Sequence, residues 1–279
     1  MRKQSKGKRG PLSRILYILV MAAALITFSI LIFLIAYILI KGIPHISPSL
    51  FALEYTSENV SLMPALINTL FITCVALLIA VPIGICSAIY LVEYAKRGNK
   101  VVNVIRVTAE TLSGIPSIVY GLFGMLFFVK ALNMGLSILA GALTLALMIL
   151  PLIMRTTEEA LQAVPDSYRE GSFGLGAGRV RTVFRIILPA AMPGILSGII
   201  LAIGRIVGET AALMYTSGTV TNIAQGLFGS GRTLAYHMYN LSSEGFHTNE
   251  AYATAVILLV IVFIINGLSA LIAKKLTKA

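Results

Sequence analysis

The stretch RTTEEALQAVPDSYREGSFGLGAGRVRTVFRIILPAAMP, residues 155–193, separates two long apolar segments of the chain. It contains five arginines and four acidic residues, whereas the segments on either side contain almost none. Charged side chains are strongly disfavoured in hydrocarbon, so this charged loop (residues 155–189) must lie outside any membrane that its neighbours cross. We expect it to meet a soluble partner.

Two short helices are predicted inside the charged loop. Ser167, followed three residues later by Glu170, forms a capping-box pattern that starts a helix near Tyr168. Glycines at positions 174, 176 and 178 end this helix, and an amphipathic turn over residues 179–187 leads to Pro189. The glycines also match a GxGxG phosphate-binding pattern, but no strand precedes them and no GK[ST] follows, so this match is weak.

The composition indicates a membrane protein with several spans. Of the 279 residues, 57% are hydrophobic, 12% are charged and none is Trp. The apolar stretches reach the length of about 17 to 25 residues that a helix needs to cross hydrocarbon. The net charge of +11 does not indicate nucleic-acid binding, because the lysines and arginines cluster beside the apolar stretches and so report topology.

We predict six membrane-spanning helices, at residues 15–40, 62–90, from the break at 113–116 to about 128, 137–154, 190–215 and 251–273. The first is too long for the core of a signal peptide, so we expect it to be retained in the mature protein. Pro82 should kink the second, at a cost that neighbouring helices can absorb. Cys74 and Cys86 lie about 18 Å apart along that helix and cannot bridge each other.

The basic residues orient these spans. With both termini inside, 18 of the 22 lysines and arginines lie on the cytoplasmic side. Excess positive charge marks the cytoplasmic face of a membrane protein. The polar segment 216–250 then lies outside, and its His237 and His247 are expected as scattered surface histidines, since no Cys or acid lies at metal-ligand spacing.

One charged pair lies inside a predicted span. Arg205 and Glu209 are four residues apart, so on a continuous helix they share one face and can form an ion pair. Small residues at 194, 198 and 202 lie on the same face and allow another helix or a solvated cavity to come close. Burying these charges in lipid is costly, which favours a place on a transport pathway. A simple helix-packing salt bridge is the alternative.

Several stretches are similar to one family, the PstA-type permeases of bacterial phosphate ABC importers. The segment from Glu170 to Pro189 resembles the EAA loop, E-A-A-x3-G-x9-I-x-L-P, with Gly171 and Ser172 in place of the two alanines. Residues 81–94, 112–124 and 200–211 carry the rest of the resemblance, and the last, ILAIGRIVGETA, is its most specific part.

The resemblance implies an all-α integral membrane fold of type I importer permeases (MetI-like), with six spans and the EAA loop between spans 4 and 5. The implied domains are a cytoplasmic basic tail 1–14, a first transmembrane helix 15–40, a permease domain 62–273 containing the ATPase-docking loop 155–189, and a cytoplasmic tail 274–279.

It also implies a role for each matching residue. Arg205 and Glu209 would line the phosphate pathway. ATPase coupling would use Glu170, Gly171, Ser172, Gly176, Ile186, Leu188 and Pro189. The implied partners are a sister permease, PstC, a homodimer of the ATPase PstB, which would bind ATP and Mg, and the phosphate-binding protein PstS. No Walker sequence occurs in this chain, so we expect it not to be the ATPase itself.

Two other functions stay open from the sequence. A permease for a different oxyanion or an amino acid would share the EAA-like loop, although it should lack the paired Arg205 and Glu209. A secondary ion-coupled transporter or membrane receptor would not need an ATPase dock, so its function would survive disruption of the Glu170 helix.

Overall fold

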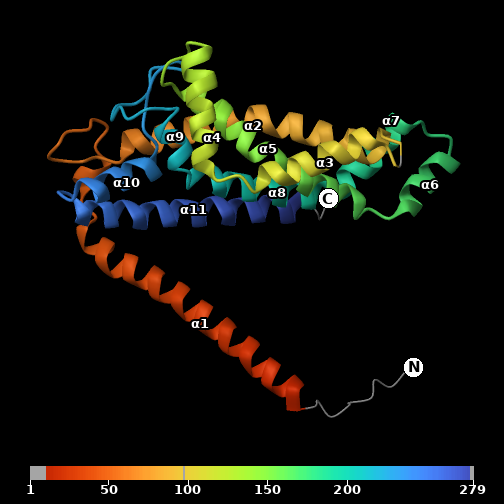
Figure 1. Ribbon diagram of the computed structural model, residues 1–279, viewed down its shortest axis with the longest axis horizontal. Helices are drawn as coiled ribbons and strands as arrows, with labels where there is room; N and C mark the ends of the chain where they lie inside the picture. Colours follow the sequence, from red (N-terminus) through yellow and green to blue (C-terminus); the bar gives the residue numbers. More distant parts are fainter. Residues whose placement is uncertain (1–10, 97, 277–279) are drawn as a thin grey trace.

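The computed structural model describes residues 11–96 and 98–276, and this part of the chain is built from helices and loops without strands (Figure 1). The all-α expectation is confirmed. The α-helices are α1 (Pro11–Gly42), α2 (Met63–Ile89), α3 (Lys100–Ser113), α4 (Ser117–Gly124), α5 (Ile138–Gln162), α6 (Asp166–Gly174), α7 (Arg179–Thr182), α8 (Leu188–Val207), α9 (Ala211–Met214), α10 (Leu234–Glu244) and α11 (Thr248–Leu276).

Tighter or wider turns extend several of these helices. Two 3-10 turns follow α1, η1 (Ile43–His45) and η2 (Pro48–Phe51). Three π-helical turns continue a neighbouring helix: η3 (Tyr90–Tyr94) after α2, η4 (Met125–Ala131) after α4 and η5 (Val183–Ile187) between α7 and α8. Because of η5, residues 179–207 form one unbroken helix.

Five helices of the described chain are long and apolar enough to cross a membrane: α1, α2 with η3, α5, α7 to α8, and α11. The pair α3 and α4 makes a sixth span only if it is counted as one helix, because it bends by 102° at the break after Ser113. No span was predicted for residues 91–112, but most of this segment forms α3. Asn99 caps this helix by accepting a hydrogen bond from the Val101 N–H.

The predicted tails fall partly outside the described residues, namely 1–10 and 277–279. Helix α1 already begins at Pro11, and α11 runs on to Leu276. The helix α2 continues through Pro82. Both cysteines are free, as expected from their spacing.

The core of the bundle lies between α2, α5 and α8. Small residues allow these helices to approach closely: a Cβ at Gly84 would lie 2.8 Å from Ile153, and one at Gly141 would lie 2.7 Å from Ile72. The small-residue face of α8 likewise packs on α5, where Gly198 lies against Thr156. This face therefore serves helix packing.

Helices α6 and α7 lie at one end of the bundle, called the loop end, and α9 and α10 lie toward the opposite end (Figure 1). There, the irregular segment 216–233 folds over the first turns of α2 and α5. Asn68 accepts a hydrogen bond from the Ala224 N–H and donates to the carbonyls of Asn222 and Arg232. The Ile138 and Leu139 N–H groups, which a helix start leaves unpaired, donate to carbonyls of the same segment.

Helix α1 diverges from the bundle (Figure 1). It meets α11 near its own carboxyl end, where Gly42 lies against Tyr252 and the rings of Tyr37 and Tyr252 are 5.9 Å apart. The rest of α1 exposes apolar side chains such as Leu19 and Phe28. This is the surface expected for a helix surrounded by lipid tails or by another membrane subunit.

His237 is fully buried on α10, so its interpretation as a surface histidine was wrong. Its ring lies 6.0 Å from the ring of Tyr55, and the Arg232 guanidinium stacks 4.6 Å from the centre of the same tyrosine ring. Burial and the nearby Arg232 cation lower the pKa of His237 to about 3. The long-range fold of residues 50–62 over α10 buries this histidine, which local composition does not reveal.

Candidate functional site

Two broken membrane helices pack on each other near Arg205. The first interrupts α3 and α4 at residues 114–116, and the second separates α8 from α9 at residues 208–210. Helix α4 packs closely on α9, since a Cβ at Gly121 would lie 2.8 Å from the Ala212 Cα. Broken helices that meet within a bundle form the binding sites of many transporters.

Arg205 lies in the last turn of α8 and is partly buried. It lies close enough to the phenol of Tyr120, on α4, to interact with it electrostatically. The Tyr120 hydroxyl donates a hydrogen bond of 2.8 Å to the Leu112 carbonyl and so bridges the bend between α3 and α4. No ion pair to Arg205 is formed within residues 11–96 and 98–276.

The expected pair of Arg205 with Glu209 is absent from the described chain, and the reason is local. Helix α8 ends at Val207, so the two residues do not share a continuous helical face. The buried carboxylate of Glu209 instead accepts a hydrogen bond of 3.0 Å from the Ala212 N–H, one of the unpaired donors at the start of α9. Within the described residues, the donors of Arg205 therefore remain free for another group.

The surroundings of Arg205 are apolar on the bundle side. Its neighbour Ile206 and the preceding turn's Ala202 belong to the buried core, together with Tyr120 and Leu213. Electrostatic interactions are stronger in such surroundings than in water. A guanidinium placed here can bind an anion through paired, charge-assisted hydrogen bonds.

The charged loop contains helix α6, but not the predicted capping box. The helix begins at Asp166, directly after Pro165, and no side chain caps it. Ser167 lies inside the first turn, because the fixed φ of Pro165 already directs the chain into the helix. The helix therefore begins two residues before the predicted start near Tyr168.

The end of α6 explains the glycine at position 176. The Gly176 N–H donates to the Phe173 carbonyl and the Ala177 N–H donates to the Ser172 carbonyl. This is the Schellman arrangement, which needs a left-handed residue at the position of Gly176, and its φ is +80°. Gly171, by contrast, has open space where a Cβ would lie.

Two elements of the charged loop are tied to each other. The buried Ser172 hydroxyl lies 2.8 Å from the Thr182 hydroxyl, which joins α6 to α7. Ile187 is buried and Ile186 and Leu188 are partly buried, so these residues anchor the loop on the bundle. Pro189 lies two residues after the π-helical turn η5, inside the continuous helix of residues 179–207.

The surface of the charged loop carries apolar side chains as well as charges. Glu170 is exposed, and so are the large apolar side chains Phe173, Leu175 and Val180, with Leu175 at 91% of its full exposure. Large apolar side chains exposed beside charged ones are typical of a surface that contacts another protein.

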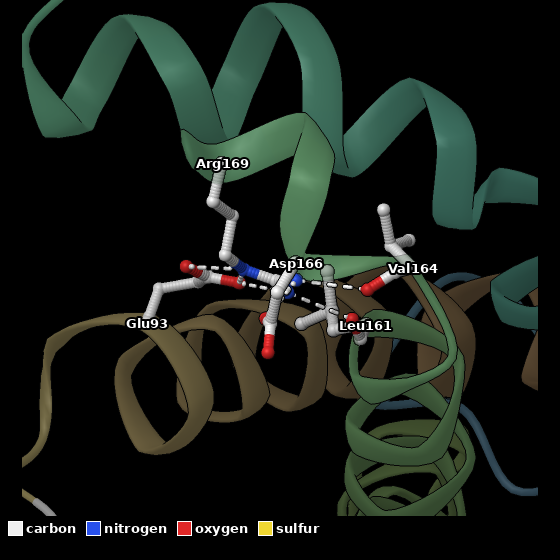
Figure 2. A network of polar contacts seen from close by, with 5 residues as sticks. All are labelled: Glu93, Leu161, Val164, Asp166 and Arg169. Atoms are coloured by element: carbon white, nitrogen blue, oxygen red, sulfur yellow. Dashed lines mark hydrogen bonds and ion pairs between the residues drawn. The ribbon is translucent and has the colours of Figure 1, made fainter. Parts of the chain in front are cut away.

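Sequence reasoning did not predict the most shielded ion pair near this surface. Arg169, on α6, pairs with Glu93, on η3, at a distance of 2.7 Å (Figure 2). The two residues are 76 positions apart. No local spacing predicts such a contact, and the only signal was an acidic residue at the end of an apolar span.

The fold and the site define a polytopic helical transport subunit. The chain belongs to the family described as the inner membrane component of binding-protein-dependent transport systems, whose pattern matches residues 80–278. This agrees with the family resemblance of the sequence.

Relatives of known description support this membership. The probable ABC transporter permease protein YqgI of Bacillus subtilis is 35% identical over 276 residues, covering 91% of this chain and 94% of its own length. The phosphate transport system permease protein PstA 1 of Mycobacterium tuberculosis H37Rv is 38% identical, over 75% of this chain and 68% of its own. PstA of Yersinia pestis is 37% identical, over 77% and 74%.

Solved structures share the fold. A chain of a bacterial alginate ABC transporter matches with a TM-score of 0.72 and 14% identity, covering 95% of this chain and 96% of that chain. A chain of the MetNI methionine transporter in an inward-facing conformation matches with a TM-score of 0.60 and 20% identity, over 77% and 94%. The expected type I importer permease fold is thereby confirmed.

Proposed function

We propose that this chain is the permease subunit of an ATP-driven phosphate importer and that Arg205 contacts the phosphate on its way through the membrane. The observation that carries the proposal is the partly buried Arg205, which has no ion-pair partner in the described chain and lies where two helix breaks meet. The relatives described as phosphate permeases support phosphate as the substrate.

The chemistry of phosphate fits an arginine at this place. Phosphate carries one or two negative charges near neutral pH and cannot enter hydrocarbon unaided. The guanidinium offers planar, paired donors that match two phosphate oxygens, a geometry that lysine lacks. Glu209 holds α9 against the site through the Ala212 N–H. We propose that it also keeps other anions out when its carboxylate turns toward Arg205.

The charged loop would bind the ATPase subunit through α6. Its exposed Glu170 and neighbouring apolar side chains support this role, as does the open space beside Gly171. Ser172 and Gly176 would shape the helix, while Ile186, Leu188 and Pro189 would join it to α8. ATP and Mg would be bound and used by the ATPase, and this subunit would carry no cofactor.

The other partners follow from the class of transporter. A second permease would complete the pathway, an ATPase dimer would drive it, and a phosphate-binding protein would deliver the substrate from outside. We place both termini and the charged loop in the cytoplasm, because most of the basic residues then lie on that side.

The test is phosphate uptake by vesicles that contain the whole transporter. Arg205→Gln should lower uptake at least about tenfold while assembly and basal ATP hydrolysis persist, because a hydrogen bond to a charged group contributes about 1.5 to 3 kcal/mol. Arg205→Lys should restore uptake only in part. Lys130→Gln removes an exposed charge of the same sign and should leave uptake unchanged.

The variant Glu209→Gln separates the anion site from a packing salt bridge. An amide oxygen can still accept the Ala212 N–H, so this change should preserve assembly. The double change Arg205→Gln and Glu209→Gln should remain inactive. Recovery of transport by the double variant would remove Arg205 from the mechanism.

A permease for another oxyanion is the second candidate, because a guanidinium binds other tetrahedral anions through the same paired donors. Competition decides between the two. Excess sulfate or molybdate should leave uptake of labelled phosphate unchanged, whereas strong inhibition by either anion would reassign the substrate.

A further inference from the structure

Arg169 connects the loop helix α6 to two helices of the bundle core (Figure 2). Its Nη2 and Nε donate to one Glu93 oxygen at 2.7 and 3.1 Å. Nη2 also donates to the Leu161 carbonyl and Nη1 to the Val164 carbonyl, each at 2.9 Å. Nη1 lies 3.1 Å from a carboxylate oxygen of Asp166.

This side chain is held more firmly than an ordinary surface arginine. Glu93 and Arg169 expose only 8% and 16% of their side chains, less in total than any other ion pair in the described chain. Exposed pairs, such as Arg155 with Glu159, are weak and loosely held. A shielded guanidinium that donates in several directions instead fixes the groups around it.

Each contact of Arg169 belongs to a different element. Glu93 lies on η3, the continuation of α2. Leu161 is in the last turn of α5, where carbonyls lack helical partners, so the guanidinium caps that helix and complements its dipole. Arg169 itself lies on α6. A displacement of α6 therefore acts on the loop ends of both α2 and α5.

Helices α2 and α5 connect the Arg169 contact with the proposed anion site at Arg205. They share one buried core with α8, to which α2 contributes Ile72 and Ala76 and α5 contributes Leu145 and Ile149. From α8, the core contains Ile206, the residue next to Arg205. Close-packed interiors transmit displacement because they contain few voids.

We propose that the ion pair between Arg169 and Glu93 makes α6 move together with α2 and α5 during the transport cycle. Arg169 and Glu93 are thus positioning residues that couple ATP hydrolysis to opening of the pathway. The inference rests on the proposed function, in which α6 docks on the ATPase. Without this ion pair, α6 could move with the ATPase while α2 and α5 keep their positions.

The first experiment measures phosphate imported per ATP hydrolysed, in vesicles containing the complete transporter. Glu93→Gln keeps the size of the side chain but removes the charge. It should lower this ratio about tenfold, within the range typical of coupling between sites, while the ATPase still co-purifies and hydrolyses ATP. Arg169→Lys keeps one charge contact and should give an intermediate ratio. Glu250→Gln, on the more exposed pair with His247 and outside the charged loop, should match the wild type.

A wild-type ratio for Glu93→Gln would overturn the proposal. A merely structural role predicts a different pattern, in which hydrolysis and uptake fall together as the complex dissociates and the ratio stays constant. That pattern would also overturn it.

A second measurement does not depend on removing the ion pair. Spin labels at Tyr168 on α6 and Leu78 on α2, both exposed, are introduced after replacement of Cys74 and Cys86. The distance between the labels in the intact transporter should be the same without nucleotide and with ATP trapped by vanadate. A change of this distance between the two states would show that α6 moves independently of α2 and would contradict the proposal.

The two levels of inference fail in different ways. If the wild-type transporter imports no phosphate, the proposed substrate is wrong, and the distance between the spin labels still tests whether α6 moves together with α2. If it imports phosphate but Glu93→Gln has a wild-type ratio of phosphate to ATP, only the proposed role of the Arg169–Glu93 pair is wrong.

Discussion

At the scale of single residues, Arg232 and Arg205 differ in how far they are shielded from solvent. Arg232 is 4% exposed, and its Nε and Nη2 are buried without hydrogen-bond partners in the described chain. The ring of Tyr55 compensates in part, because an aromatic face attracts a cation. Arg205 is more accessible and lies beside the helix breaks. Both have unused donors within the described chain, and we propose Arg205 as the substrate contact because it is the more accessible of the two.

The buried His237 predicts acid sensitivity. In the unfolded chain its pKa is about 6.5, whereas in the fold burial and Arg232 lower the pKa to about 3. Between these values the unfolded chain binds a proton that the folded chain does not, so acidification favours unfolding. Stability should therefore fall by up to about 1.4 kcal/mol per pH unit as the pH drops below about 6.5.

Thermal unfolding of the purified protein between pH 7.5 and pH 5 measures this effect. His237→Asn should reduce the pH dependence of the melting temperature. His247→Asn, at a partly exposed histidine, should leave that dependence as in the wild type. The same pH dependence in wild type and His237→Asn would assign the acid sensitivity to other groups.

At the scale of elements, the breaks and ends of helices form the site. The two helix breaks near Arg205 interrupt apolar spans and leave unpaired backbone groups close to its charge. The left-handed Gly176, two residues after the last residue of α6, ends the loop helix and so sets its length. Both features depend on a few residues that stop a helix.

Two glycines of the charged loop should respond oppositely to alanine. Gly176→Ala places a Cβ at a φ of +80°, which costs roughly 1 to 2 kcal/mol and frays the end of α6. Gly171→Ala meets open space inside the helix and should stabilise it by about 1 kcal/mol. Retention of the ATPase subunit during purification should fall for the first variant and stay or rise for the second.

Equal retention in both glycine variants would mean that the ATPase contact does not depend on the shape of α6. The proposed docking role of the charged loop would then be wrong. Insertion of both variants into the membrane, measured by their yield in the membrane fraction, controls for misfolding.

At the scale of the whole molecule, the two ends of the bundle differ in kind. The loop end carries α6 and α7 with their exposed charges, and the opposite end is closed by the segment 216–233 and α10 (Figure 1). Helix α1 leaves the bundle and offers its apolar surface to lipid or to a second membrane subunit. This surface fits our proposal that the chain is one subunit of a larger transporter.

The orientation of the bundle is open to a direct test. Single cysteines at Ser167 on α6 and Gln225 in the opposite segment, both exposed, replace Cys74 and Cys86 as the reactive thiols. An impermeant thiol reagent should label Gln225→Cys from outside and Ser167→Cys only after the membrane is opened. Labelling of both from one face would contradict the six-span topology.

The sequence by itself determined the class of this protein. Long apolar segments can be stable only in a membrane or a buried core, and the spacing from Glu170 to Pro189 carries the family resemblance. It also singled out Arg205, because a charge in an apolar span is costly and needs a reason. These inferences need only residues that are close to one another in the sequence.

Only the tertiary structure decided what the singled-out residues contact. Helix α8 ends at Val207 and α9 packs on α4, so Glu209 caps α9 instead of pairing with Arg205. Arg169 finds Glu93 from 76 residues away. The physical reason is that helix ends and ion pairs depend on side chains brought together by packing of distant segments, whereas apolar length and charge are properties of the local sequence.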